Sequence, residues 1–273
     1  MERTILVLSE RPDAAAGLLM AAERFADLIG GGNITVLTVC RPVSIPILAM
    51  SDWKFSQNEI DEFMADERRR LAALEATYDR WAAQIAARNI SAQRRLINGD
   101  TTEIVREHGA DADFIVVARP AADDDAESKD MFRAAIFETN RPVLVVPAGP
   151  SAPFGHRVGI AWREDKHARQ SIAAALPLFK GAEQLHIFAG VRERQPQVIP
   201  PDFLDEQERR ASLHVIPIGG HPLGETILSE AKALGVDLLV MGAYYHSPLR
   251  EQIFGGVTRS VLANATIPLF MFH

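Results

Sequence analysis

The chain has 273 residues, 47% of them hydrophobic, and a formal net charge of −7. This length suits about two domains with cores of their own, and the acidic balance argues against nonspecific binding to nucleic acid, which depends on basic patches. No apolar run is long enough to cross a membrane.

Cysteine content and the first residues bear on the compartment. The single cysteine, Cys40, excludes an intrachain disulfide and suits a reducing environment. Residues 1–4 lead directly into a predicted strand, without the charged leader, apolar stretch and cleavage site of a signal peptide. We therefore expect a cytoplasmic protein.

The first half of the chain alternates predicted strands with predicted helices. Residues 4–8 form a short apolar run typical of a strand, and apolar residues at helical spacing follow over 12–29. Three glycines end this helix, and residues 33–39 predict the second strand. The remaining predicted elements of this half are strands at 91–97, 112–117 and 141–146 and a helix at 101–109.

A long helix is predicted from Ser56 to about residue 89. It begins with a capping box, Ser56-Gln57-Asn58-Glu59, and its apolar residues line one face. The charges at 66–70 are of mixed sign, which favours a solvated face over a site for an anionic partner.

The second half repeats the first after a linker at residues 147–156, which contains three prolines and two glycines. Asp113 and Asp237 differ by 237 − 113 = 124 positions, and Pro142 and Pro268 by 268 − 142 = 126. A near-constant offset indicates two copies of one unit. We therefore predict two domains, at residues 1–149 and 156–273, each with a parallel sheet and helices on both faces.

The stretch 238–268 holds the strongest candidate for a ligand site. An apolar run ends at Gly242, and Gly255-Gly256 precedes a predicted helix. Glycines let the backbone approach an anion, and a helix start offers unpaired N–H groups. An ordinary strand-to-helix loop explains the same pattern, and no lysine follows as a Walker loop requires.

With these features the chain resembles the tandem form of the universal stress protein family over nearly all of its length. The resemblance is carried by residues 99–117, by their second copy, and by MGAYYHSPLREQIFGGVTRSVLANATIPLF at 241–270. It implies two tandem α/β/α sandwiches of the adenine-nucleotide hydrolase-like type, each with a five-stranded parallel sheet, related as a pseudo-dimer. Because single-domain relatives pair through their last strands, residues 143–146 and 269–272 should meet within one chain.

The resemblance also implies ATP or another adenine nucleotide, with or without magnesium, at the carboxyl ends of the strands, where open α/β sheets generally bind ligands. Its contacts would be in the second domain. The implied residues are Ala161, Trp162 and Arg163 beside the adenine, Met241 and Gly242 beside the ribose, and Gly255, Gly256, Val257 and Thr258 at the phosphates. Arg250, in the loop, is a further candidate for a phosphate contact, although an exposed loop arginine is most often only solvated.

The nucleotide motif of the family is only half kept. Its first and third glycines fall on Gly242 and Gly255, but the second falls on Tyr245 and the hydroxyl position on Gly256. If position 245 needs positive φ, Tyr245 is strained there and its ring fills part of the pocket. If position 245 tolerates tyrosine, the ring lies against the ligand. Arg163 stands where the family has an aspartate or asparagine, and arginine cannot accept a hydrogen bond from adenine, although it can contact a phosphate or stack on a base.

The first copy has lost more of the motif. Residues 118–126 contain Asp123-Asp124-Asp125 in place of the glycine loop, and an acidic loop would repel phosphates. Three consecutive side chains rarely converge on one cation, so we expect the first domain to be a structural half.

The sequence shows none of the common catalytic or metal-binding motifs. The eight histidines show no zinc-ligand spacing, Cys40 has no activating neighbour besides Arg41, and no GxSxG, Walker lysine or HExxH occurs. We therefore expect no catalytic and no metal-ligating residues.

Three functions remain in order of preference. The first is a non-catalytic stress-response or signalling protein that binds an adenine nucleotide weakly through the second domain. The second is a nucleotide-independent scaffold that contacts an unknown protein partner, with the helix at 56–89 as its recognition surface. The third is a slow ATPase. The sequence leaves open the stress signal, the partner and whether two chains form a further homodimer.

Overall fold

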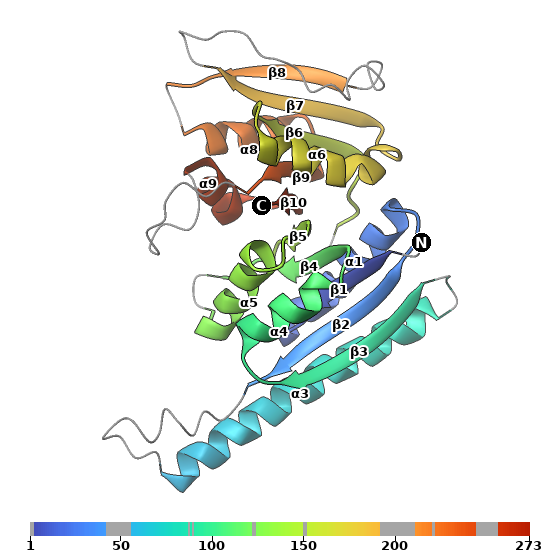
Figure 1. Cartoon of the computed structure of the whole chain (residues 1–273), viewed down its shortest axis with the longest axis vertical. Helices are drawn as coiled ribbons and strands as arrows, with labels where there is room; N and C mark the ends of the chain where they lie inside the picture. The colour runs from blue at the N-terminus through green and yellow to red at the C-terminus, as the bar shows by residue number, and fades with distance from the viewer. Residues whose placement is uncertain are drawn as a thin grey trace.

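The computed structural model describes residues 3–41, 56–86, 88, 90–121, 124–149, 152–191, 211–219, 222–243 and 256–273. Strands and helices alternate along both halves (Figure 1). The elements of the first half are β1 (Thr4–Leu8), α1 (Pro12–Leu28), β2 (Asn33–Cys40), α3 (Gln57–Ile85), β3 (Ser91–Asn98), α4 (Thr101–Ala110), β4 (Phe114–Ala118), α5 (Ala126–Phe137) and β5 (Val143–Val146).

The second half repeats this order over its described residues. Its elements are β6 (Arg157–Trp162), α6 (Lys166–Phe179), β7 (Gln184–Val191), β8 (Ala211–Pro217), α8 (Leu223–Ala233), β9 (Leu238–Gly242), α9 (Gly256–Asn264) and β10 (Leu269–Phe272). None of the helices that the structure describes combines the length and apolarity that a membrane crossing needs.

The sheet order is β3-β2-β1-β4-β5-β10-β9-β6-β7-β8. All pairs within each half are parallel, and the last strands of the two halves, β5 and β10, pair antiparallel with Val145 opposite Leu269 and Val143 opposite Met271. The predicted meeting of residues 143–146 with 269–272 is confirmed, as is the α/β class with two five-stranded parallel units. Because this pair is hydrogen-bonded, the two units form one continuous sheet across the seam.

Two hydrophobic cores, one on each face of the sheet, run through both halves. Helices α1, α3 and α6 contribute to one core, and α4, α5, α8 and α9 to the other. At the seam, Phe270 of β10 lies against Phe25 of α1 and Phe114 of β4, with ring centroids 6.0 and 6.2 Å apart. The halves therefore share their apolar interior.

Local signals explain where several helices begin and end. Pro12 occupies the first turn of α1, and Gly30 and Gly31, with φ of 87° and 102°, follow its end. The predicted capping box of α3 is present, since the Ser56 and Glu59 side chains each bond the backbone of the other. From the sequence, we expect a turn-rich stretch at 192–211 in place of the long helix in the second copy. Residues 192–210 lie outside the described residues.

The sequence does not predict helix α5, which follows the acidic stretch directly. Asp125, assigned by sequence to an acidic loop, is the N-cap of this helix and accepts a hydrogen bond from the Ser128 amide. The buried residues Met131, Phe132 and Ile136 hold the helix on the sheet. Asp125 is thus part of an ordered helix start.

Candidate functional site

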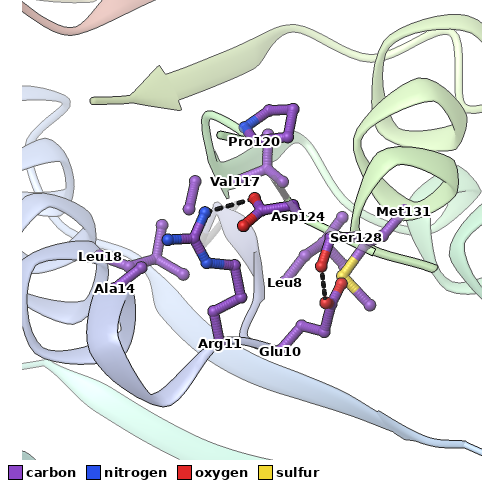
Figure 2. A pocket seen from close by; sticks show the side chains of 11 residues that line it. Leu8, Glu10, Arg11, Ala14, Leu18, Val117, Pro120, Asp124, Ser128 and Met131 are labelled. Atoms are coloured by element: carbon purple, nitrogen blue, oxygen red, sulfur yellow. Dashed lines mark hydrogen bonds and ion pairs between the residues drawn. The ribbon is translucent and has the colours of Figure 1, made fainter. Parts of the chain in front are cut away.

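In the first half, charged side chains gather where the strands end. Glu10 and Arg11 follow β1, Arg41 follows β2, and Asp124 precedes α5. Residues at the ends of β1 and β4 and at the starts of α1 and α5 line a cavity of about 20 Å³ (Figure 2). A cavity of this size holds about one water molecule and is far too small for a nucleotide.

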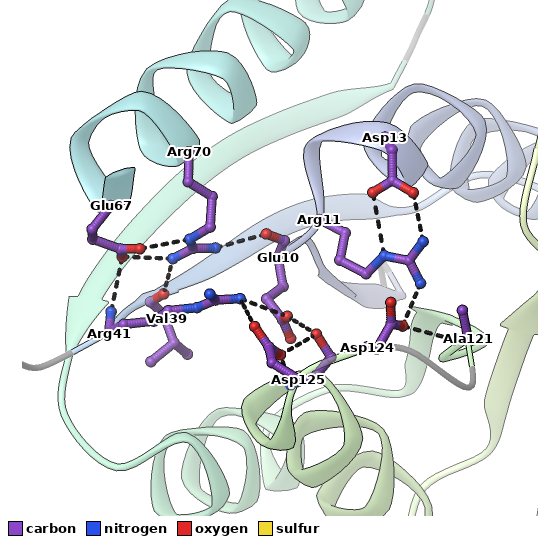
Figure 3. A network of polar contacts seen from close by, with 11 residues as sticks. Glu10, Arg11, Asp13, Val39, Arg41, Glu67, Arg70, Ala121, Asp124 and Asp125 are labelled. Carbon is purple, nitrogen blue, oxygen red and sulfur yellow. Dashed lines mark hydrogen bonds and ion pairs between the residues drawn. The ribbon is translucent and has the colours of Figure 1, made fainter. Parts of the chain in front are cut away.

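Arg11 closes one side of this cavity. Its Nη1 donates to Asp124 Oδ2 at 2.5 Å, while its Nε and Nη2 donate to Asp13 (Figure 3). The amide of Ala121 donates to the same Asp124 oxygen at 2.7 Å. Asp124 therefore accepts the hydrogen bonds that an anionic ligand would otherwise receive at this edge.

Glu10 and Ser128 line the other side, and Arg41 pairs with Glu10 next to it. Arg41 Nη2 lies 2.7 Å from an Asp125 oxygen and 3.3 Å from a Glu10 oxygen, and the Ser128 hydroxyl donates to Glu10. Burial raises the pKa of the Glu10 carboxyl, against the opposing effects of Ser128 and Arg41. The hydrogen-bonding capacity of the Glu10 carboxyl group is thus taken up by neighbours of the same chain.

Arg70 of α3 joins the long helix to this edge. Its guanidinium donates to both oxygens of Glu67, at 2.8 and 2.7 Å, and to the backbone oxygens of Glu10 and Val39, at 2.7 and 2.8 Å (Figure 3). Four charge-assisted bonds from one side chain fix α3 against the ends of β1 and β2.

The network as a whole is acidic. Its five carboxylates outnumber its three guanidiniums, so a nucleotide phosphate would meet repulsion. Sequence reasoning missed Glu10, Arg11 and Arg41, although charged residues placed directly after buried strands are a readable signal. Asp123 lies outside the described residues. The carboxylates are Glu10, Asp13, Glu67, Asp124 and Asp125, and the guanidiniums Arg11, Arg41 and Arg70.

In the second half, two of the predicted strand ends lie side by side. Ala161 of β6 pairs with Met241 of β9, so Gly242 and Trp162 end neighbouring parallel strands at one edge of the sheet. Trp162 is buried. The structure thus brings the predicted adenine and ribose residues together.

Arg163 follows β6 with an exposed side chain. Its Nε donates to Asp165 Oδ2 at 2.5 Å, while the other Asp165 oxygen caps α6 by accepting from the Ala168 amide at 3.0 Å. Asp165, which sequence reasoning took only as part of a helix, therefore places a carboxylate beside the arginine at this edge.

Helix α9 begins at the same edge with Gly256. A Cβ added to Gly256 would meet no atom of the described residues within 4 Å, so these residues leave space around it. Val257 is half-buried, and its carbonyl oxygen lies 3.0 Å from where a Cβ on Gly224 of α8 would stand, so that glycine permits the two helix starts to pack closely.

The Thr258 side chain is buried, and its hydroxyl oxygen has no hydrogen-bond partner among the residues that the structure describes. A buried hydroxyl without a partner costs free energy. The remaining predicted phosphate-site residues, Tyr245, Arg250 and Gly255, lie outside the described residues, so their placement stays a prediction.

The parallel sheet with helices on both faces places the chain among the doubly wound α/β proteins. Ligands of such proteins bind at the carboxyl ends of the strands. A model of the universal stress protein family matches residues 120–273, which is more than half of the chain. The chain belongs to the universal stress protein family. No curated protein matches it.

Solved structures share the fold over the full length. A universal stress protein from Archaeoglobus fulgidus superposes with a TM-score of 0.65 at 17% identity, covering 98% of this chain and 95% of its own. A proposed universal stress protein from Pseudomonas aeruginosa gives 0.61 at 17% identity, with 99% and 93% covered. The cytoplasmic domain of a prokaryotic cation chloride cotransporter gives 0.52 at 13% identity, with 99% and 95% covered. Since proteins of different function share this fold, function must be argued from the site.

The part of the chain that the structure describes has no cluster of three or more histidine, cysteine, aspartate or glutamate side chains that could hold a metal ion. Burial and the charge of Glu67 raise the pKa of the Cys40 thiol, which keeps it protonated and unreactive.

Two histidines of the outer strands form a contact far from the strand ends discussed above. His186 Nδ1 of β7 lies 3.1 Å from His214 Nε2 of β8. Burial lowers the pKa of His186, and the charges of His214 and Arg157 act in the same direction. The folded chain therefore holds His186 neutral more firmly than the unfolded chain does.

Lowering the pH is expected to decrease the free energy of unfolding through His186. The unfolded chain takes up the proton first, so the contribution is present above the unfolded pKa of about 6.5 and is lost as the pH falls through that value toward the folded pKa. Urea unfolding at about pH 7.5 and 5.5 should show a larger loss for the wild type than for His186→Gln. Equal losses would contradict the prediction.

Proposed function

We propose that this universal stress protein is a non-catalytic stress-response protein of the cytoplasm that binds ATP or a related adenine nucleotide weakly, through the carboxyl edge of β6 and β9. The observation that carries the proposal is the difference between the two halves. In the first half, ion pairs of the chain itself fill the corresponding edge. In the second half, the described residues leave space around Gly256 and give the buried Thr258 hydroxyl no hydrogen-bond partner.

The second-half residues fit such a ligand in chemical terms. The start of α9 offers unpaired N–H groups and a favourable dipole to a phosphate, and a ligand oxygen reaching Thr258 would relieve the cost of its hydroxyl. Arg163 can stack on a base or contact a phosphate, and the Asp165 carboxylate beside it supplies acceptor oxygens that the arginine lacks.

Thermal unfolding with ATP and magnesium tests the proposal. A ligand present at 100 times its Kd stabilises the folded chain by about 2.7 kcal/mol, so millimolar ATP should raise the Tm of the wild type. Gly256→Asp should abolish the rise, because a carboxylate at the start of a helix is tolerated by the fold but repels a phosphate.

Gly181→Asp is the matched control. Gly181 lies between α6 and the amino end of β7, at the opposite edge from the carboxyl ends of the strands, and the described residues leave space around it as they do around Gly256. It should keep the ATP response. No rise in the wild type at millimolar ATP would refute nucleotide binding, and phosphate release above background would point to a slow ATPase instead.

A scaffold role through helix α3 is the second candidate. The amino end of α3 projects past the strands (Figure 1), and it carries exposed apolar side chains, with Phe63 at 42% and Met64 at 44% of full exposure. Apolar side chains on a projecting helix suit contacts with a protein partner. This role would be favoured if the ATP experiment is negative.

A further inference from the structure

Arg119 bridges the two halves of the chain. It follows β4 in the first half, and its Nη1 donates to the carbonyl oxygens of Leu262, at 3.0 Å, and Ala265, at 2.5 Å, at the carboxyl end of α9 in the second half. Its amide donates to the Val146 carbonyl oxygen at 2.7 Å, at the end of β5. Both its backbone and its side chain are therefore fixed.

The charge of Arg119 is directed at a helix end. Burial alone lowers the pKa of its guanidinium, and no carboxylate of the described residues pairs with it. The last carbonyl groups of a helix lack partners within the helix and carry its negative partial charge. Arg119 supplies both the donors and the positive charge that this end of α9 requires.

The second half has no arginine at the equivalent position. The amide of Ala243 donates to Phe272 O at 2.8 Å, as the amide of Arg119 does to Val146 O, and the two positions differ by 243 − 119 = 124, the offset of the repeat. Since alanine has no donor side chain, the bridge runs only from the first half to α9. The repeat itself therefore does not explain Arg119.

Helix α9 connects this bridge to the candidate site. It spans nine residues, so only about 14 Å separates its carboxyl end from Gly256, and a short helix moves as one rigid body. Gly224 leaves α8 in close contact with the other end of α9. A shift of the carboxyl end would thus move the amino end that faces the ligand.

We propose that Arg119 is a positioning residue through which the first half holds α9 and, with it, the phosphate-facing end of the second-half site. The effect on a ligand rests on the proposed nucleotide binding, whereas the effect on α9 does not. The degenerate half would then have a defined task, which is to orient the helix of the other half.

Hydrogen exchange followed by mass spectrometry on the full chain tests the proposal. Arg119→Met keeps the length and apolar stem of the side chain but removes its donors and charge. Exchange of the α9 amides should become about tenfold faster, the size expected for losing hydrogen bonds to a charged group, while α8 and α4 keep their protection. Arg119→Lys, which retains the charge and N–H donors but not the planar guanidinium, should keep part of the protection.

Arg133→Met is the matched control, because Arg133 is exposed on α5 and bonds only Asp130 of its own helix, at 3.2 Å, among the described residues. It should leave α9 unchanged. Unchanged α9 exchange in Arg119→Met, or an equal increase in every helix, would overturn the proposal. If this variant does not fold, Arg119→Lys should still show faster exchange in α9 than the wild type, and unchanged α9 exchange in it would overturn the proposal. If the wild type fails to bind ATP, the proposed function is refuted, while the exchange result still decides the role of Arg119. If the wild type binds ATP, Arg119→Met should lower the affinity for ATP severalfold.

Discussion

Phe270→Ala is expected to lower the free energy of unfolding by about 3–5 kcal/mol, the range for truncating a buried phenylalanine. Phe270 is fully buried, and its ring packs at the seam against Phe25 and Phe114 of the first half. The truncation opens a cavity between elements of both halves and removes aromatic contacts as well as buried area. Urea unfolding followed by circular dichroism measures the loss.

Phe63→Ala is the control for this change. Phe63 is exposed on α3, so its truncation should alter the free energy of unfolding by no more than about 0.5 kcal/mol. Because both cores cross the seam, the wild type should unfold in one transition. Two separate transitions, or a Phe270→Ala loss as small as that of Phe63→Ala, would contradict a shared interior.

Arg70→Met should cost about 2–4 kcal/mol, because removing one partner of a largely buried ion pair leaves the other charge uncompensated. Only 10% of the Arg70 side chain is exposed. Its loss removes the ion pair with Glu67 and the donors to two backbone carbonyl groups at the ends of β1 and β2. The middle turns of α3 around Arg70 should also lose protection from hydrogen exchange, since Arg70 fixes this part of the helix to the sheet.

Arg69→Met provides a control one residue away. The Arg69 side chain is 72% exposed and pairs with Asp66 on the surface of the same helix. Such surface pairs contribute about 0–1 kcal/mol, so urea unfolding should barely change. Similar effects of the two substitutions would show that the network at the strand ends adds nothing to stability.

Patterns within a few residues predict most of the elements. The apolar run at 4–8 and the capping box at Ser56 correspond to β1 and to the start of α3, because strand and helix preferences act over short distances. The offset between Asp113 and Asp237 predicts the repeat, and the family resemblance carries the pairing of β5 with β10. The sequence fails to predict α5 because its apolar residues stand among charges, and its burial depends on the sheet beneath it.

Contacts between distant positions depend on the tertiary structure alone. Glu10, Arg41 and Asp125 meet because β1 and β2 end, and α5 begins, at the same edge of the sheet. No local sequence pattern relates these three positions. Arg119 and Leu262 are 143 residues apart. Such partners are set by strand order and register, which follow from burying both faces of the whole sheet. The ion pairs at the strand ends of the first half and the bonds of Arg119 to α9 are therefore decided by the tertiary packing. The helices and strands that pack are decided by the local sequence.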